Sequence, residues 1–239
     1  EAGSLSQLLF HGVEKRFGRR LILEGVDISL TAGHCQLLCG RNGAGKSTLL
    51  RILAGMERPD HAYVTVDGTV RQWRRAKKRL LAECIYLHQQ PYLFEGSVHY
   101  NLNYPLRGGR AARESRIREG LEWSGLTALS EQPVHQLSSG ERQRVALVRA
   151  WLRGPRVMLL DEPTANMDTA CRQRTVELLQ VLKQQGMALL VATHDIHAFA
   201  EVAESTWDLR DGRLRDADLA PADLPEKVTP IARRVRWTA

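Results

Sequence analysis

The sequence predicts an α/β fold with a mostly parallel sheet, an N-terminal antiparallel β subdomain and an inserted helical subdomain. Short apolar segments at 34–40, 156–162 and 187–195 alternate with helical patterns, which is typical of a parallel sheet covered on both faces. Two alternating segments near the N-terminus indicate antiparallel strands joined by a turn. Between 91 and 154, polar and arginine-rich helical stretches interrupt the alternation, so we expect a helical insertion there.

The first half of the chain predicts strands and helices in the following order. Alternation at 8–17 and 22–30 predicts the two antiparallel strands, and 34–40 predicts a short buried strand. The segment 48–55 has helical apolar spacing and ends at a glycine. Another alternating strand is expected at 62–68, then a short helix or loop over the basic segment 71–83, and a strand at 84–89.

The stretch "GRNGAGKST" follows the predicted strand 34–40 and opens the predicted helix, which is the context that a P-loop requires. Glycines let backbone N–H groups wrap a phosphate chain without a Cβ collision. Lys46 supplies a point charge for the β- and γ-phosphates, and the Ser47 hydroxyl is a ligand for Mg²⁺. The fold class is therefore refined to a P-loop NTPase core, and a nucleoside triphosphate with Mg²⁺ is the expected ligand set.

The second half completes this core. The segment 91–154 is helical with breaks at 107–109 and 131–133, after which come a strand at 156–162, an amphipathic helix at 169–186 and a strand at 187–195. We expect residues 1–89 to hold the antiparallel β subdomain and the first part of the core, 90–154 the helical subdomain and 155–215 the rest of the core. Residues 216–239 are expected to form a loosely packed extension.

Polar side chains follow three of the predicted core strands. Asp161 ends one apolar strand and can hold Mg²⁺, while Glu162 beside it is suited to polarise an attacking water, which favours hydrolysis over phosphoryl transfer to a metabolite. His194 ends the next strand and Gln89 follows an earlier one. Because ligands gather at the carboxyl ends of parallel strands, we expect His194 to contact the γ-phosphate and Gln89 to sense Mg²⁺ or the water.

The stretch "QLSSGERQRVALVRA" (136–150) begins a helix in the insertion. Ser138 and Glu141 have the spacing of a capping box, in which each side chain satisfies a backbone N–H at the helix start. Any open helix N-terminus also attracts anions. From these residues alone, a simple cap and a phosphate site both remain open.

Composition is that of an ordinary soluble globular protein, with 239 residues, 43% hydrophobic and 26% charged. No apolar run approaches the roughly 20 residues of a membrane span, and no secretory signal pattern is present. The sequence does not begin with Met, so its start is expected to be trimmed or artificial. The four cysteines lack CxxC and metal-ligand spacing and are expected to be reduced thiols, with Cys35 and Cys39 flanking a buried strand. The net charge of +7 fits an anionic partner, with basic clusters at 71–79 and 232–237 that are first interpreted as solvated faces.

Taken in order, the P-loop, Gln89, "LSSGE", "LLDEPTANMD" and "THD" resemble the nucleotide-binding subunit of an ABC transporter. The resemblance covers about residues 8–215, and "LSSGE" ahead of "LLDEP" separates this family from P-loop kinases, GTPases and RecA-like motors. It implies a homodimer in which two subunits pair head to tail around two ATP molecules. It also implies separate transmembrane permease subunits, a solute-binding protein for an importer, and a place on the cytoplasmic face of the inner membrane, with the isolated subunit soluble.

The resemblance assigns roles residue by residue. Asp161 is the Walker B aspartate, Glu162 the general base and His194 the switch histidine. Gln89 is the Q-loop residue and also a Mg²⁺ ligand. Phe17 is the aromatic residue that stacks on adenine, although an alternating strand would also carry a core Phe at this position. The Walker A loop is Gly40, Arg41, Asn42, Gly43, Ala44, Gly45, Lys46, Ser47 and Thr48; the signature that contacts ATP of the other subunit is Ser138, Ser139, Gly140 and Glu141; the D-loop is Ala165, Asn166, Met167 and Asp168.

The signature departs from the commoner Ser-Gly-Gly-Gln, because Ser139 adds a Cβ and Glu141 adds a charge. We expect Glu141 to brace the turn while Ser139 and Gly140 face outward. Met167 replaces a usual Leu of similar volume.

The leading function is an ATPase that powers transport, and overall similarity suggests an importer of a small oxyanion such as tungstate. The segment "PYLFEGSV" after Gln89 is expected to receive a helix of the permease, although its aromatics could equally be local core. An ABC-type ATPase acting on nucleic acid or ribosomes is the alternative, supported by the basic segment 71–79. The absence of a long coiled-coil insertion, a zinc-binding cysteine set and a second nucleotide-binding domain in this sequence disfavours nucleic acid as a partner.

Overall fold

A computed structural model describes residues 7–217 of the chain. Its strands are β1 Gln7–Phe17, β2 Arg20–Thr31, β3 Cys35–Cys39, β4 His61–Val66, β5 Thr69–Gln72, β6 Cys84–Leu87, β7 Val157–Asp161, β8 Ala188–Ala192, β9 Ser205–Arg210 and β10 Arg213–Asp216. Its α-helices are α1 Lys46–Leu53, α2 Trp73–Glu83, α3 Val98–Asn103, α4 Arg110–Ser124, α5 Ser139–Leu152 and α6 Thr169–Gln184, with short 3-10 turns at Thr127–Leu129, Val134–Gln136 and His197–Phe199. Nearly all of the extension expected at 216–239, including the basic cluster 232–237, lies outside the described residues.

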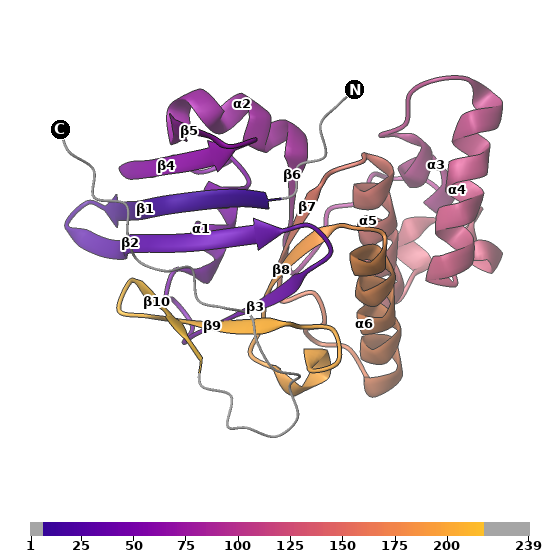
Figure 1. Cartoon of the computed structure of the whole chain (residues 1–239). Coiled ribbons are helices and arrows are strands. Elements are labelled where there is room, and N and C mark those ends of the chain that lie inside the picture. Colours follow the sequence, from indigo (N-terminus) through magenta and orange to yellow (C-terminus); the bar gives the residue numbers. More distant parts are fainter. Residues whose placement is uncertain (1–6, 218–239) are drawn as a thin grey trace.

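Two sheets form the body of the molecule (Figure 1). The first has the order β2-β1-β4-β5 and is antiparallel throughout. The second has the order β10-β9-β3-β8-β7-β6, and all its neighbouring strands are parallel except the edge pair β9 and β10. This arrangement confirms the predicted α/β class, while the hairpin β9–β10 was not predicted.

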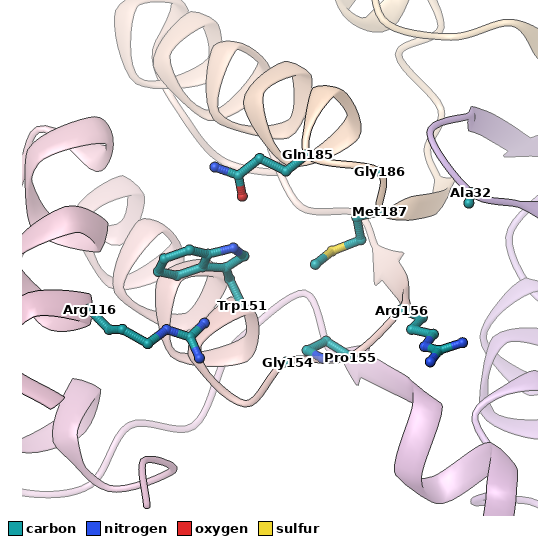
Figure 2. A pocket seen from close by; sticks show the side chains of 9 residues that line it. All are labelled: Ala32, Arg116, Trp151, Gly154, Pro155, Arg156, Gln185, Gly186 and Met187. Carbon is teal, nitrogen blue, oxygen red and sulfur yellow. The ribbon is translucent and has the colours of Figure 1, made fainter. Parts of the chain in front are cut away.

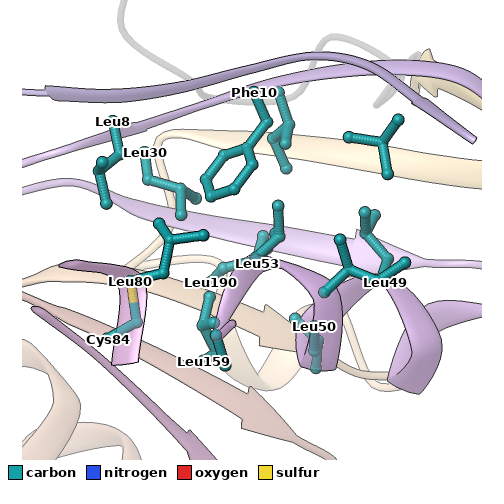
Figure 3. Close-up of a cluster of buried hydrophobic side chains, with 14 of the residues drawn as sticks. Leu8, Phe10, Leu30, Leu49, Leu50, Leu53, Leu80, Cys84, Leu159 and Leu190 are labelled. Atoms are coloured by element: carbon teal, nitrogen blue, oxygen red, sulfur yellow. The ribbon is translucent and has the colours of Figure 1, made fainter. Parts of the chain in front are cut away.

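The helix α1 is enclosed between the two sheets, where it completes the main core (Figure 3). Leu8, Phe10 and Leu30 point from the antiparallel sheet toward Leu49 and Leu53 of α1. Leu159 and Leu190 of the parallel sheet pack from the other side. Burial of apolar side chains at about 25 cal/mol per Å² makes this three-layer core the main determinant of how the sheets are placed.

A second core covers the opposite face of the parallel sheet, beneath α5 and α6. Cys35 and Cys39 belong to this core and are buried free thiols, as expected from the sequence. Burial raises the pKa of Cys39 to about 11 and that of Cys35 to about 12. A third core holds α3, α4 and α5 together as a helical group beside the sheet (Figure 1).

No helix within residues 7–217 combines the length and the apolar character that a membrane crossing requires.

Candidate nucleotide site

The P-loop connects the buried end of β3 to the start of α1. At two of its positions, only glycine fits both the backbone conformation and the surrounding space. Gly40 has φ of +140°, and a Cβ there would lie 2.6 Å from the carbonyl oxygen of Leu209 in β9. Gly45 has φ of +107°, and a Cβ would lie 2.8 Å from Ile22 Cγ2 in β2. Both values belong to backbone that L-residues avoid. The loop is therefore shaped by close contact with both sheets.

Lys46 spans this loop from the first turn of α1. Its Nζ donates to the carbonyl oxygen of Gly40 at 2.7 Å and to that of Arg41 at 3.4 Å, and the residue is 8% exposed. No acidic side chain occupies the first turn of α1, so the N–H groups and the partial positive charge of the helix end stay available. Arg41, Asn42 and Gly43 are exposed beside it. The loop is thus chemically suited to bind phosphate.

Asp161 lies at the end of β7, on the same edge of the sheet as the P-loop. It is 7% exposed, and its Oδ2 accepts a hydrogen bond of 2.9 Å from the hydroxyl of Tyr86 in β6. Burial and the Asp161 carboxylate raise the pKa of Tyr86, so the phenol stays protonated and donates. The bond fixes one carboxylate oxygen and leaves the other for a ligand.

Glu162 and His194 meet at this edge, as expected for residues that end neighbouring strands. Glu162 has φ of +50°, and its N–H donates to the carbonyl oxygen of Ala192 at 2.8 Å. Its Oε2 lies 2.9 Å from His194 Nδ1, with the Glu162 side chain 17% exposed and that of His194 73% exposed. An ionised carboxylate only accepts, so Nδ1 carries the proton in this contact. Glu162 is thus a non-glycine residue held in left-handed conformation, and such residues cluster at functional sites.

Gln89 follows β6 at the same edge of the sheet but does not join the cluster. It is exposed, and within the described part of the chain no hydrogen bond connects its side chain to Asp161, Glu162 or His194. Its role in sensing Mg²⁺ or water stays a prediction.

Phe17 ends β1 and is 48% exposed, so the alternative of a core phenylalanine is wrong. The ammonium of Lys15 lies 4.7 Å from the centroid of its ring. This cation–π contact holds one side of the ring near the end of the strand. Stacking on adenine stays a prediction.

The signature segment forms the predicted capping box at the start of α5. Glu141 Oε2 accepts from the Ser138 N–H at 2.8 Å, and Ser138 Oγ accepts from the Glu141 N–H at 3.3 Å. The Ser138 backbone bond holds the pKa of Glu141 below its usual range, with further contributions from the Ser138 hydroxyl, Arg144 and Arg174. Glu141 therefore points back at its own turn.

Ser139 is exposed at the N-terminus of α5, but Gly140 is buried, which corrects the expectation that both face outward. A Cβ on Gly140 would lie 2.8 Å from Cys171 Sγ in α6. The close approach of the two helices requires glycine here, and it turns the Cα of Gly140 toward α6.

The D-loop leads from β7 into α6. Asn166 is exposed in left-handed conformation, with φ of +59°. Met167 is buried, and its Sδ lies 3.6 Å from the Thr175 hydroxyl. Asp168 caps α6 by accepting from the Cys171 N–H at 2.8 Å. Asn166 and Asp168 are therefore exposed while Met167 is buried between them, and only the Asp168 side chain is used in a helix cap.

Tyr86 and Cys171 are the two residues near this site that sequence reasoning missed. Tyr86 stands in the strand just before Gln89, so a polar side chain neighbouring the Asp161 strand was the available signal. Cys171 carries no signal, because its contact with Gly140 depends on how α5 and α6 dock.

The site is chemically suited to Mg²⁺ held partly by phosphate. Ser47 and Asp161 offer oxygen donors, and Gln89 would add a third, which are the ligands that Mg²⁺ prefers. Within residues 7–217, no cluster of three or more His, Cys, Asp or Glu side chains could hold a metal ion. A Mg²⁺ ion bound through one carboxylate and nucleotide phosphates fits this donor set.

A hollow of the described structure lies away from these motifs. A cavity of about 420 Å³ opens where several core strands begin, between Arg116 of α4, Trp151 of α5 and Met187 before β8 (Figure 2). The guanidinium of Arg116 lies 5.0 Å from the Trp151 ring. Because Asp161 and His194 follow the opposite ends of these strands, the cavity is separate from the nucleotide motifs.

Comparison with known proteins supports this arrangement. A family model described as ABC transporter matches residues 23–165. The chain is 34% identical over 227 residues to the Fe(3+) ions import ATP-binding protein FbpC of Serratia marcescens, covering 92% of this chain and 65% of that protein. It is 33% identical over 222 residues to the phosphate import ATP-binding protein PstB 2 of Natronomonas pharaonis, covering 86% of this chain and 78% of that protein.

The fold has solved counterparts. The structure of CbiO1 from Clostridium perfringens, part of the ABC transporter complex CbiONQ, aligns with a TM-score of 0.79 at 25% identity and covers 87% of this chain and 86% of its own. The match with this chain spans 65% of the length of FbpC from Serratia marcescens and 63% of the length of FbpC from Pseudomonas fluorescens.

Proposed function

The chain belongs to the ABC transporter family as an ATP-binding domain, and from this premise we propose that it hydrolyses ATP to power transport across a membrane. The observation that carries the proposal is the Glu162–His194 contact of 2.9 Å at the edge of the sheet that also holds the P-loop and Asp161. A carboxylate held there by a second side chain is suited to orient water against a γ-phosphate.

Each residue has a distinct part in the proposed reaction. The P-loop N–H groups and Lys46 bind the β- and γ-phosphates, and Asp161 and Ser47 hold Mg²⁺, which when bound neutralises phosphate charge. Glu162 orients the water and accepts its proton. His194 donates its Nδ1–H to Glu162. It can donate a second hydrogen bond to phosphate only if both ring nitrogens are protonated, or it can donate to phosphate instead after the contact with Glu162 breaks.

The catalytic unit we propose is a head-to-tail homodimer. Ser139 is exposed at the N-terminus of α5, where N–H groups and the helix dipole favour an anion. Within one chain, α5 belongs to the helical group beside the core rather than to the P-loop end of β3 (Figure 1). A second copy would bring its signature to the γ-phosphate, with the exposed Asn166 of the D-loop crossing between the sites.

An exposed aromatic group supports docking on a permease at the cytoplasmic face of a membrane. Tyr92 is 74% exposed and Tyr104 is 61% exposed, and both pack against Phe94, with ring centroids 5.6 and 4.4 Å away. This cluster directly follows Gln89, so permease contact would be adjacent to the nucleotide edge. A solute-binding protein would complete an importer.

We further propose that the cargo is a small oxyanion. The names of two relatives refer to phosphate and to aliphatic sulfonates, whereas others refer to Fe(3+). The test measures ATP hydrolysis in vesicles that contain the cognate permease. We expect tungstate or phosphate to stimulate hydrolysis and Fe³⁺ not to do so. Stimulation by Fe³⁺ alone would remove the oxyanion assignment.

Replacing the proposed base tests the hydrolytic function itself. Glu162→Gln keeps the shape of the side chain but cannot accept a proton, so kcat should fall about 100-fold or more while ATP affinity is retained. The ATP-bound dimer should accumulate, as measured by size-exclusion chromatography. Glu119→Gln, at an exposed position of α4, is the matched control and should hydrolyse normally. Normal turnover of Glu162→Gln would show that another group is the base.

A further inference from the structure

One strongly charged surface has no part in the proposed function. The cationic face consists of Arg71 on β5 and of Arg74, Arg75, Lys77 and Lys78 on α2, all exposed. In the described residues 7–217, none of these five side chains has an ion pair within 4.0 Å. The neighbouring Arg79 differs, because it contacts Asp67 at 3.2 Å and Glu83 at 2.9 Å.

The cationic face costs α2 stability. Arg74 and Arg75 lie in the first turn, which has no acidic residue, and cations there oppose the helix dipole. Arg74 also lies one turn before Lys77 and Lys78, and like charges at this spacing repel. The helix is held instead by its underside, where Trp73, Ala76 and Leu80 are buried. A charge pattern that opposes the helix it stands on is better explained by an external anionic partner than by folding.

Apolar side chains adjoin the cationic face. Leu81 is 41% exposed and lies one turn after Lys77 and Lys78 on the same side of α2. Met56 is 58% exposed and follows Gly55, whose Cβ position is 3.2 Å from Leu81 Cγ. A basic helix face bordered by exposed aliphatic side chains is the pattern of a segment that lies in the interface of a bilayer.

Nucleic acid fits this surface less well. Single-stranded nucleic acid is usually bound by aromatic side chains on which bases stack, but Trp73, the aromatic residue of α2, is 3% exposed. The phosphate backbone of a duplex has no apolar surface that Leu81 and Met56 could contact. Figure 1 shows α2 at the outer margin of the antiparallel sheet, and no other helix or strand within residues 7–217 covers it in this view.

We propose that α2 lies against a bilayer surface and binds anionic phospholipid headgroups. Arg71, Arg74, Arg75, Lys77 and Lys78 contact the phosphates while Leu81 and Met56 enter the interface. The contact would orient the subunit on the membrane independently of ATP, and so goes beyond hydrolysis and permease docking.

Vesicle binding of the full chain tests the proposal without nucleotide. The protein should co-sediment with vesicles of phosphatidylcholine containing one quarter phosphatidylglycerol, but not with pure phosphatidylcholine, and binding should weaken as salt rises. Since each basic residue near an anionic surface strengthens binding about fivefold, the variant Arg74→Gln/Arg75→Gln/Lys77→Gln/Lys78→Gln should bind at least about 100-fold more weakly. Leu81→Gln should weaken binding at unchanged net charge.

A matched variant separates local contact from net charge. Arg107→Gln/Arg110→Gln/Arg118→Gln/Arg215→Gln removes the same charge from exposed positions on and near α4 and on β10, and should bind nearly as the natural chain does. Both quadruple variants should bind ATP as the natural chain does and should unfold at a temperature no lower than that of the natural chain, which shows that they fold. Equal loss in both variants, no preference for anionic vesicles, or tighter binding to a labelled DNA or RNA duplex that the α2 variant abolishes would each overturn the proposal.

Discussion

The hydrogen bond from Tyr86 to Asp161 illustrates how single residues set the nucleotide edge. Asp161 is buried at the end of β7, and a buried carboxylate is costly unless its oxygens are satisfied. The Tyr86 hydroxyl satisfies one oxygen at 2.9 Å and thereby sets the direction of the other. At the residue scale the site is therefore supported from the neighbouring strand.

Removal of this hydroxyl should weaken the Mg²⁺-dependent part of nucleotide binding. In Tyr86→Phe, Asp161 loses its donor, and loss of a partner that orients a metal ligand commonly lowers metal affinity about tenfold. The expected result is weaker binding of a fluorescent ATP analogue with Mg²⁺ and unchanged binding without it. Tyr63→Phe, at a half-exposed position of β4, is the control. Equal Mg²⁺ dependence in both variants would show that Asp161 does not need Tyr86.

At the scale of elements, the capping box of α5 makes the signature helix sensitive to acid. Glu141 has a pKa below its ordinary 4.5 because it accepts from the Ser138 N–H. A lowered folded pKa means that Glu141 contributes stability above about pH 4.5, which is lost as the pH falls through the folded value. The cap is complete at neutral pH.

Glu141→Ala should lower the free energy of unfolding by about 1 kcal/mol at pH 7, as loss of a helix cap does. Urea unfolding of the variant and the natural chain should give curves that converge as the pH falls below 4.5, since protonation removes the contribution from the natural chain. Glu141→Gln keeps an amide oxygen that can accept from the Ser138 N–H but carries no carboxyl group. The difference in unfolding free energy between Glu141→Gln and Glu141→Ala should therefore change little with pH. A stability gap that persists undiminished in acid would contradict a role for the ionised carboxylate.

Elements with strong local patterns could be predicted, and those that depend on docking could not. The strand before "GRNGAGKST" and the helix after it follow from apolar spacing and glycine chemistry. The hairpin β9–β10 was missed because "STWDLR" and "RLRD" mix polar and apolar residues. The strand character of β9 comes from pairing with β3, and that of β10 from pairing with β9. In the site, the meeting of Glu162 and His194 followed from strand ends, whereas the packing of Gly140 on Cys171 depends on the distance between two helices.

At the scale of the whole molecule, the site within one chain is incomplete for the proposed reaction. The P-loop, Asp161, Glu162 and His194 share one edge of the sheet, while the signature begins α5 in the helical group. Pairing of two copies would complete each site, so ATP binding and hydrolysis should be separable.

Ser139→Arg should separate them. The added bulk and length at the exposed start of α5 would obstruct the second copy, so the variant should bind ATP as a monomer but fail to hydrolyse it. In a Glu162→Gln background it should not form the ATP-bound dimer, as measured by light scattering. Ser115→Arg, on an exposed position of α4, should dimerise and hydrolyse normally. Normal hydrolysis by Ser139→Arg would show that the signature does not face phosphate.

The contact of Gly40 with β9 also has a consequence for synthesis of the chain. The nucleotide loop packs on Leu209, and the adjoining hairpin is anchored by the ion pair of Glu24 with Arg213, 189 residues apart. A ribosome produces the loop well before its supporting strand. The nascent loop therefore lacks its final shape until β9 has emerged, and ATP can stabilise this domain only after that point of synthesis.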